Sequence, residues 1–567
     1  MTESVSAQIS IFKKILLFLL FIPVLLLAQQ ENVPIHHDVY TFLKEMKVKN
    51  ILDNIHDDAP NMSRYEVKKN LEMIAAKSSE LSNTEKRLLK KYQNEFYDDQ
   101  ADSTNTFQFF GKGAGFSNNY SDVFSDKMKY TFAYKRDKVN FYLNVMGRIL
   151  YGQEITPQKD NSELFDIGFR MHGTLIDKLG YSLTVQKGGI SGSIGFASVL
   201  DPRLNYNYKY IENTENIGNY DFAEGYLRYY TEPIENMKLG FQIGREKIKL
   251  GYGYGSRLVL SGEHPYLDFV RMDFNYGVFS FTSITASTVG EFHLDRTENY
   301  TKYIAYNKFK LSLKNFADIG LGEAIIYSGR GFDLAYLNPF AFYKFEEMAL
   351  QDRDNGTVYL DLQTNCLKNI ELQGTFFLDE NILSHLQDMS LYTNKTAYQI
   401  GAFWYSPFNI NDLSFVLEYT KIRPYVYSHT NPKNSYTSFG QSLGDPIGPN
   451  SDELYSRLSY NFSEKLRGNV EYQFIRSGEN IYDGAGNLLY NAGGDYLVPF
   501  RENIDPQHIN FLSGERINQS IITLNLRYEP FREIYFDLFY KYNSTRYIEK
   551  SSSENSSYAY LRLIFEF

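Results

Sequence analysis

Two long polar segments of the chain hold aromatic, guanidinium, imidazole and carboxylate side chains at close spacing. Aromatic faces pack against the apolar side of pyranose rings, and guanidinium, amide and carboxylate groups bond sugar hydroxyls. The pattern therefore indicates carbohydrate recognition; the alternative is that these tyrosines pack on one another. The candidate residues are Arg423, Tyr425, Tyr427, His429, Tyr436 and Asp445 in one segment, and Tyr252, Tyr254, Arg257 and His264 in the other.

Other motifs that could do chemistry are incomplete. The glycine-rich run 251–255 lacks the Lys-Ser or Lys-Thr of a phosphate-binding loop, so it predicts a tight turn or a kink. Residues 352–356 begin like a calcium-binding loop, but the distal Glu is missing. His36, His37 and His56 suit helix ends better than a metal site, and the chain has no Gly-x-Ser-x-Gly motif. We therefore expect no enzyme, no metal and no cofactor.

The first thirty residues predict export from the cytoplasm. Two lysines precede an apolar stretch from Ile15 to Leu27, which is short for a membrane-spanning helix and ends just before Gln29. This arrangement predicts a cleaved signal peptide over residues 1–28. The one cysteine, Cys366, lies far from the cleavage site, which argues against a lipid-anchored amino terminus and an intramolecular disulfide.

Residues 29–100 predict a small helical domain. Apolar residues recur three and four positions apart in three segments between Pro34 and Phe96, which is the period of an amphipathic helix. Two of these segments begin with a capping box, in which Ser and Glu side chains bond the free amides at the helix start. The boxes are Ser63 with Glu66 and Ser82 with Glu85.

Residues 101–567 predict a membrane-spanning β-barrel. Apolar residues alternate with polar ones, as at Met128, Tyr130 and Phe132, in about twenty segments. Aromatic residues make up 16% of the chain, with 48 Tyr and 43 Phe, yet the mean hydropathy is only −0.40. Barrels have this profile because only every second strand residue meets lipid, while aromatic residues gather at the interfaces. The net charge of −10 argues against binding to nucleic acid.

The connections between these segments are sorted by length. Long connections follow odd-numbered strands and short ones follow even-numbered strands, as in outer-membrane barrels with short periplasmic turns and long outer loops. This sorting predicts an outer-membrane protein with both barrel ends and the helical domain in the periplasm. The long connections are Gly188 to Asp221, Ile248 to Tyr266, Ser328 to Asn355, Arg423 to Asp452 and Ser477 to Arg516.

The carboxyl-terminal segment has the pattern of a final barrel strand. Leu561, Leu563, Phe565 and Phe567 alternate with more polar residues. A terminal aromatic residue after an alternating strand resembles the signal that the outer-membrane insertion machinery reads. We therefore predict Phe565 and Phe567 as the membrane-insertion signal, with that machinery and outer-membrane lipid as partners.

Several stretches together resemble the Wzi-type capsule assembly family. The resemblance implies an 18-stranded outer-membrane barrel with a periplasmic helical bundle and an occluded lumen. It further implies a lectin that holds capsular polysaccharide at the cell surface. The stretches are Val33 to Ile35, Tyr40 to Leu43, Ser63 to Glu66, Gly244-Arg245, Gly251 to Gly253, Leu258 to Ser261, Tyr336 to Tyr343 and Leu443 to Pro449.

We accordingly predict an all-β antiparallel transmembrane barrel of about 18 strands, within a range of 16 to 20, and a small amino-terminal helical bundle. The predicted function is to bind capsular or extracellular polysaccharide and to anchor or assemble it at the cell surface. The alternative is a substrate-specific porin, which shares every barrel feature. Inward-facing candidates such as Asn140, Tyr142 and Asn144 are of mixed polarity and do not separate the two.

Overall fold

The computed structural model describes residues 29–97, 105–111, 116–136, 138–212, 218–314, 316–351, 353–379 and 387–567. The predicted signal peptide, residues 1–28, lies outside the described residues. No helix in the part of the chain that the structure describes is both long and apolar enough to cross a membrane.

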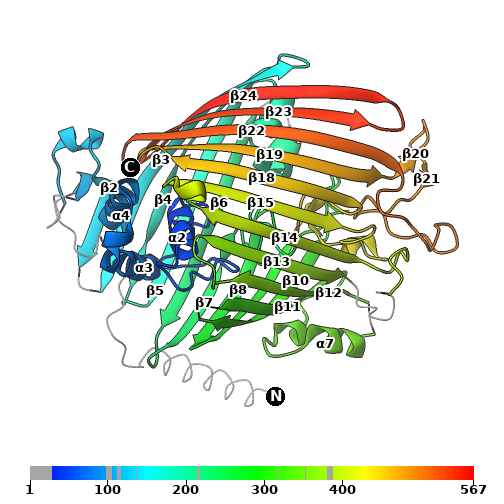
Figure 1. Cartoon of the computed structure of the whole chain (residues 1–567), viewed down its shortest axis with the longest axis horizontal. Coiled ribbons are helices and arrows are strands. Elements are labelled where there is room, and N and C mark those ends of the chain that lie inside the picture. The colour runs from blue at the N-terminus through cyan, green and yellow to red at the C-terminus, as the bar shows by residue number, and fades with distance from the viewer. Residues whose placement is uncertain are drawn as a thin grey trace.

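Eighteen antiparallel strands form a closed barrel, and the ring closes where the last strand pairs with the first (Figure 1). This confirms the predicted fold class. The barrel strands are β3 (Val139–Thr156), β4 (Asn161–Leu175), β5 (Leu179–Gly192), β6 (Asn219–Thr231), β7 (Met237–Glu246), β8 (Leu267–Tyr276), β9 (Phe279–Val289), β10 (Thr301–Leu313), β11 (Ala317–Ser328), β12 (Asn355–Thr364), β13 (Ile370–Asp379), β14 (Thr396–Tyr405), β15 (Leu413–Ile422), β18 (Ser451–Asn461), β19 (Leu466–Glu479), β22 (Glu515–Phe531), β23 (Ile534–Tyr547) and β24 (Ser552–Glu566).

Two further strands of the same sheet lie outside the ring. β1 (Thr106–Phe110) pairs in parallel with β2 (Met128–Arg136), and β2 pairs with the first part of β3. The later part of β3 pairs with β24 instead. The count of about twenty alternating segments therefore included strands that do not belong to the closed wall, because period-two alternation does not distinguish a ring strand from a strand attached to its edge.

Strand lengths differ around the barrel. The strands from β7 to β18 in the ring have 10 to 13 residues, which is close to the length of a tilted membrane-spanning strand. β3 has 18 residues and β22 has 17, so this side of the wall extends beyond a bilayer. Along β10, Phe309 and Leu311 are exposed on the outside, whereas Tyr306 and Lys308 are buried inside.

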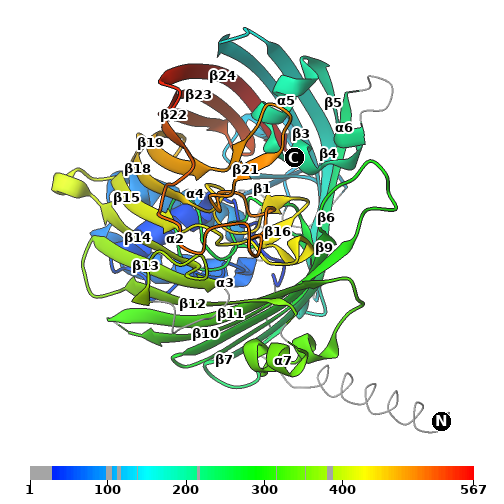
Figure 2. The same cartoon turned by 90° about the vertical axis from the view of Figure 1, so that its right-hand side faces the viewer.

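The connections gather at two rims. One rim carries short turns, such as residues 277–278 and 532–533, and we call it the short-turn rim. The opposite, long-loop rim carries the connections 193–218, 247–266, 329–354, 423–450 and 480–514. The 423–450 and 480–514 connections cross the mouth of the ring at the long-loop rim (Figure 2).

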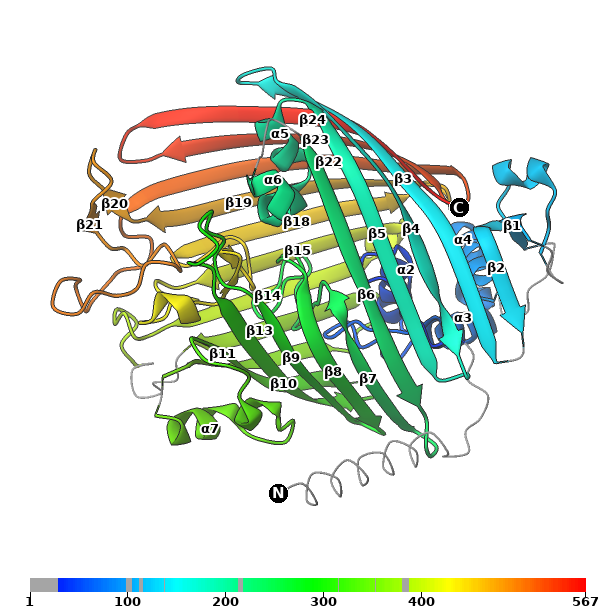
Figure 3. The ribbon, with the colours of Figure 1, turned by 180° about the vertical axis from the view of Figure 1, so that it is seen from behind.

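A three-helix bundle lies at the short-turn rim (Figure 3). It contains α2 (Val39–Val48), α3 (Arg64–Ala76) and α4 (Asn83–Phe96). Both predicted capping boxes are present, at Ser63 with Glu66 and at Ser82 with Glu85. The bundle has a core of its own. Its buried apolar side chains are Val33, Val39, Phe42, Leu43, Met46, Ile51, Leu52, Ile55, Met62, Val67, Leu71, Ile74, Leu81, Leu88, Leu89, Tyr92 and Phe96.

Ion pairs fix the bundle to the barrel wall. Arg467 on β19 lies 2.9 Å from Glu45 of α2, and Lys47 lies 3.2 Å from Glu371 on β13. The side chains of Glu45, Lys47 and Glu371 are almost fully buried. Desolvation makes such pairs costly to break, because removing one partner leaves an uncompensated buried charge. The bundle is therefore docked in the mouth of the barrel and does not hang loosely below it.

Candidate functional site

The two loops that hold the predicted sugar-binding residues meet inside the barrel. The Tyr427 hydroxyl donates to the Leu258 carbonyl at 2.7 Å, and the Tyr436 hydroxyl donates to the Val259 carbonyl at 2.8 Å. The two tyrosine rings stack with their centroids 5.2 Å apart. The connection 423–450 is thus joined to the connection 247–266 through tyrosine hydroxyl groups that donate to backbone carbonyls.

Most candidates in the 423–450 loop are buried. Tyr425, Tyr427, Tyr436 and Asp445 have no exposed surface, and Arg423 and His429 have 4% and 7%. The Arg423 guanidinium donates to the backbone carbonyls of Asn394, at 3.1 Å, and Met389. The hydrogen bonds that Arg423, Tyr427 and Tyr436 make to backbone carbonyls indicate that these side chains have a structural role in the loop. Direct contact between these side chains and a sugar stays a prediction.

The candidates in the 247–266 loop extend into the lumen and contact the bundle. The Arg257 guanidinium donates to the Asp57 carbonyl at 2.9 Å, and the Gly251 amide donates to the Asp58 carbonyl at 2.9 Å. Tyr252 is buried beside Lys308, whose Nζ lies 5.1 Å from the ring centroid. The loop therefore crosses the interior of the barrel and links the wall to the bundle.

The other two candidates of this loop also have partners within the chain. The Tyr254 hydroxyl donates to the Glu371 carboxylate at 2.9 Å. Both ring nitrogens of His264 face carbonyl oxygens, of Pro265 at 2.6 Å and of Ile248 at 2.9 Å. Burial lowers the pKa of His264 to about 4, although both carbonyls act in the opposite direction. The glycine run bends at Tyr254–Gly255, and a Cβ at Gly253 would lie 1.7 Å from the Ser256 carbonyl oxygen.

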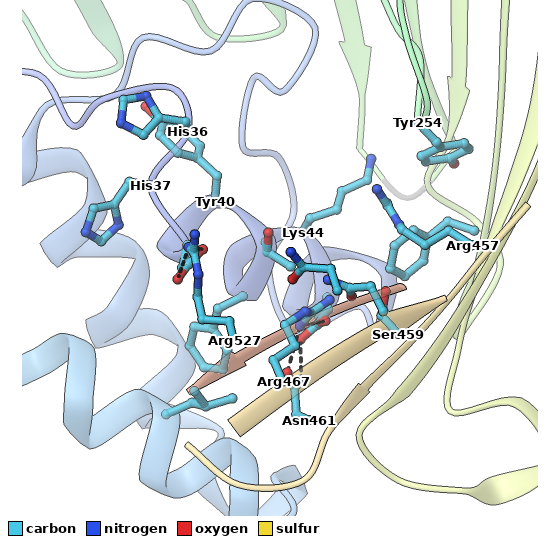
Figure 4. Close-up of a pocket in the computed structure, with 18 of the residues that line it drawn as sticks. His36, His37, Tyr40, Lys44, Tyr254, Arg457, Ser459, Asn461, Arg467 and Arg527 are labelled. Carbon is cyan, nitrogen blue, oxygen red and sulfur yellow. Dashed lines mark hydrogen bonds and ion pairs between the residues drawn. The ribbon is translucent and has the colours of Figure 1, made fainter. Parts of the chain in front are cut away.

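A cavity remains between the bundle, this loop and the wall. The cavity measures about 560 Å³ and is bounded by α2, the 247–266 loop and strands β18, β19 and β22. Lys44, Arg457, Arg467 and Arg527 enter it from different elements (Figure 4). A second cavity of about 740 Å³ shares the lining segment 35–38 and extends toward β3 to β7. The two cavities are therefore lined by both cationic and acidic side chains, and the bundle and the loop divide the interior of the barrel.

Asp58 has a role that the sequence did not reveal. Its carboxylate lies 2.9 Å from Lys308 and also pairs with Lys310, both on β10 and both almost fully buried. Burial alone would raise the pKa of Asp58, but the two ammonium groups outweigh it and hold the pKa below its usual range. Next to it, Nδ1 of His56 accepts a hydrogen bond from the Lys310 ammonium at 3.2 Å. Among the described residues, no group of His, Cys, Asp and Glu side chains could hold a metal ion.

An aromatic and charged surface faces outward at the long-loop rim. Tyr392 and Phe500 stack in parallel with centroids 3.6 Å apart, and Phe500 packs on Tyr425 below. Tyr482 is 46% exposed, and Arg501 pairs with Asp505 at 2.7 Å. We call this surface the rim platform; it comprises the exposed Tyr482, the half-buried Tyr392, Phe500 and Arg501, and the buried Asp505 that pairs with Arg501. The length of this connection could be predicted from the sequence, but its position over the barrel mouth could not.

One cluster near the platform superficially resembles a catalytic arrangement. The Ser390 hydroxyl lies 2.7 Å from Nδ1 of His508, and the Asp388 carboxylate lies 3.7 Å from the same nitrogen. In a serine hydrolase the carboxylate and the nucleophile contact opposite nitrogens of the imidazole. Both contacts fall on one nitrogen here, and the Ser390 hydroxyl also bonds Asp388 at 2.7 Å. The cluster therefore has the geometry of a loop hydrogen-bond network.

Comparison with protein families decides the identity of this barrel. The family model described as capsule assembly protein Wzi matches residues 105–558. The chain belongs to the Wzi capsule assembly family. The family match also supports an outer-membrane location for this barrel. Among curated proteins, no relative is found.

One solved structure shows the same fold. Wzi of Escherichia coli, described as an outer membrane protein involved in group 1 capsule assembly and as a carbohydrate binding β-barrel, superposes with a TM-score of 0.55 at 12% identity. The superposition covers 94% of this chain and 99% of that one. Two Pseudomonas aeruginosa barrels are less similar. OprD has a TM-score of 0.40 at 11% identity, covering 75% of this chain and 95% of its own, and OccK5 has 0.43 at 8% identity, covering 75% and 98%.

Proposed function

We propose that this Wzi-family barrel binds capsular or extracellular polysaccharide at its long-loop rim and holds it at the cell surface. The observation that carries the proposal is the family match, together with a solved barrel of that name described as carbohydrate binding. The arrangement of the interior supports it. Because the bundle and the 247–266 loop occupy the lumen, the outer rim is the face that a long polymer can reach.

The rim platform has the chemistry for this role. Tyr482 and the Tyr392–Phe500 pair offer aromatic faces for pyranose rings, and Arg501 offers planar donors for hydroxyl or carboxylate groups. The predicted residues of the 423–450 loop lie below this surface. The Tyr425 ring packs under Phe500, and its backbone amide donates to the Gly493 carbonyl at 2.9 Å. In this proposal Arg423, Tyr425 and Tyr427 position the platform.

The same proposal assigns the helical bundle to the periplasm. The bundle lies at the short-turn rim, and short turns face the periplasm in outer-membrane barrels. Protease added outside intact cells should therefore leave residues 29–97 uncut. Cleavage there in intact cells would refute the proposed orientation.

A binding assay tests the platform. Replacing Tyr482 by Ala removes one aromatic face, and a lost stacking contact of about 1 to 1.5 kcal/mol corresponds to roughly tenfold weaker binding. The matched control is Tyr208→Ala, since Tyr208 is 39% exposed on a different connection of the same rim. Purified full-length protein would be titrated with the host's own surface polymer. If Y482A bound the polymer as tightly as Y208A, Tyr482 would not be part of the binding site.

A conductance measurement tests the porin alternative. The bundle is held in the barrel by buried ion pairs, so the purified protein should carry no large, stable current in a planar bilayer. Large open-channel currents from the intact chain would favour diffusion through the lumen and would contradict a polysaccharide-holding role.

A further inference from the structure

One connection of the long-loop rim folds over the outside of the barrel. Residues 329–351, which we call the outer arm, follow β11 and include the short helices η6 (Leu334–Leu337) and α7 (Tyr343–Ala349). In three views α7 lies outside the ring of strands (Figures 1, 2 and 3). The arm therefore differs from the connections 247–266, 423–450 and 480–514, which lie within or across the barrel.

The arm packs on the wall face that looks away from the lumen. Tyr336 and Tyr343 form a buried cluster with Ala305 of β10 and Ile325 of β11. The next residue on β11, Ile326, belongs to the apolar core inside the barrel. Because side chains alternate along a strand, Ile325 points outward, toward the membrane side.

The arm covers polar groups on that outer face. Asn307 on β10 lies directly opposite Glu323 on β11. Because every second residue of a strand points the same way, Glu323 faces the membrane side like Ile325, and its partner Asn307 faces that side too. The Tyr343 amide donates to the Glu323 carboxylate at 2.9 Å, and the Asn307 side-chain amide donates to the Ala341 carbonyl at 3.2 Å. A carboxylate facing lipid is costly when it has no partner. The arm supplies partners and leaves Glu323 only 8% exposed.

Contacts place the arm well below the outer end of the wall. Asn307, which bonds the arm, lies six residues along β10 from Thr301 at the long-loop rim. At ~3.3 Å per residue and a tilt of ~40°, this corresponds to about 15 Å of depth, compared with an apolar band of about 25 Å. Further down, the Phe340 ring stacks with Phe281 at 5.8 Å, and Phe281 packs on the lipid-facing Phe309 at 4.5 Å.

The surface that the arm presents outward is strongly apolar. Its exposed side chains continue the lipid-facing band of the wall, which includes Phe309, Leu321 and Leu360. In water such a surface would be unfavourable, and isolated exposed patches of this kind mark contact sites. The exposed apolar residues of the arm are Phe332, Leu334, Leu337, Phe340, Phe342, Phe345 and Met348.

Several backbone amides of the arm are bonded within the chain. The Asp333 amide donates to the Tyr327 hydroxyl at 3.1 Å, and the Phe340 amide donates to the Asn338 side chain at 3.2 Å. The Phe345 amide donates to the Phe342 carbonyl at 3.0 Å. Backbone in contact with acyl chains requires internal partners of this kind, because lipid provides none.

From these contacts we propose that the outer arm is a lipid-binding element that lies against the acyl chains of the outer leaflet. It extends the membrane contact of β9 to β11 and shields the Asn307–Glu323 pair. The occupant of its apolar face is lipid and not a second copy of the chain, because the face is continuous with the lipid-facing wall. The proposal is independent of which ligand the rim binds.

Depth-dependent fluorescence quenching tests the proposal. Trp404 is the only tryptophan, so Phe345→Trp in a Trp404→Phe background reports on the arm alone. The full-length protein would be placed in nanodiscs with one barrel each, made with lipids brominated on the acyl chains. The wall control is Leu360→Trp and the aqueous control is Tyr482→Trp, in the same background; Leu360 is 49% exposed and Tyr482 is 46% exposed.

We expect F345W to be quenched nearly as strongly as L360W and several-fold more than Y482W. Phe342→Trp gives a second reading if the first variant assembles poorly, since Phe342 is also exposed, at 56%. Quenching at the level of Y482W for both arm positions would overturn the proposal, whether water or protein covers the face. One barrel per disc excludes shielding by a second copy.

Discussion

Replacing Asp58 by Asn should release the bundle from the barrel. Asp58, Lys308 and Lys310 have side-chain exposures of 3%, 2% and 3%. Breaking a buried ion pair by removing one partner costs about 3 to 5 kcal/mol. Lys308 keeps Asp361 as a partner, so the lower value, about 3 kcal/mol, applies, which shifts the undocking equilibrium by roughly two orders of magnitude.

Native-state proteolysis of the purified, full-length barrel measures this change. When docking and undocking are faster than cleavage, the cutting rate in the bundle follows the population of the open form. The rate should therefore rise about a hundredfold in D58N at neutral pH, where the carboxylate is ionised because Lys308 and Lys310 lower its pKa against the effect of burial. Lys310→Met added to D58N should recover part of the loss, since it removes the uncompensated charge.

The matched control is Asp53→Asn in the same segment. Asp53 pairs with Lys314 at 2.9 Å, but the two side chains are 50% and 69% exposed. An exposed pair contributes at most about 1 kcal/mol, so D53N should change the cleavage rate only a few-fold. Equal cleavage rates for D58N and D53N would refute the argument that buried charge holds the bundle in the mouth.

Three other perturbations have defined outcomes. His37→Gln should lower the melting temperature most at low pH, and less as the pH rises through the raised pKa of His37. Burial lowers this pKa, but Glu95, 3.0 Å away, raises it overall, so the stabilising charge is lost at high pH. Tyr427→Phe leaves the Leu258 carbonyl unpaired and should lower the free energy of unfolding by about 1 to 3 kcal/mol, measured by thermal unfolding. A variant as stable as the wild type would argue that this hydrogen bond does not hold the two loops together. Deleting Phe567 should reduce the amount of heat-modifiable, assembled barrel in membranes, and an undiminished band would contradict its role in insertion.

The sequence was informative wherever a pattern repeats along the chain. Alternation predicted the wall, and the pairs Ser63–Glu66 and Ser82–Glu85 marked two helix starts that the structure contains. Patterns of this kind are local, so they depend on neighbours within a few residues. The strand Thr106–Phe110 shows their limit, because pairing at the edge of the sheet and pairing in the ring require the same alternation.

The environment of the loop residues could not be predicted in the same way. Tyr427 and Tyr482 are both tyrosines of long polar connections, yet the first is fully buried and the second is 46% exposed. The difference arises from which connection folds inward, and that depends on contacts with residues about 170 positions away, such as Tyr427 with Leu258. The role of Asp58 could not be predicted either, because its partner Lys308 is on a distant strand.

The bundle is bonded to strands on both sides of the seam that closes the barrel. Glu31 accepts a hydrogen bond from the Thr174 hydroxyl of β4 at 2.6 Å, and Asp38 pairs with Arg527 of β22 at 3.1 Å. β4 is the neighbour of β3 on one side of the β3–β24 seam, whereas β22 lies two strands before β24 on the other side. In order of synthesis the bundle precedes every strand, and β24 comes last. The bundle can therefore hold the two free edges of an unfinished sheet near each other, so that assembly of the wall becomes a wrapping reaction around an interior that is already folded.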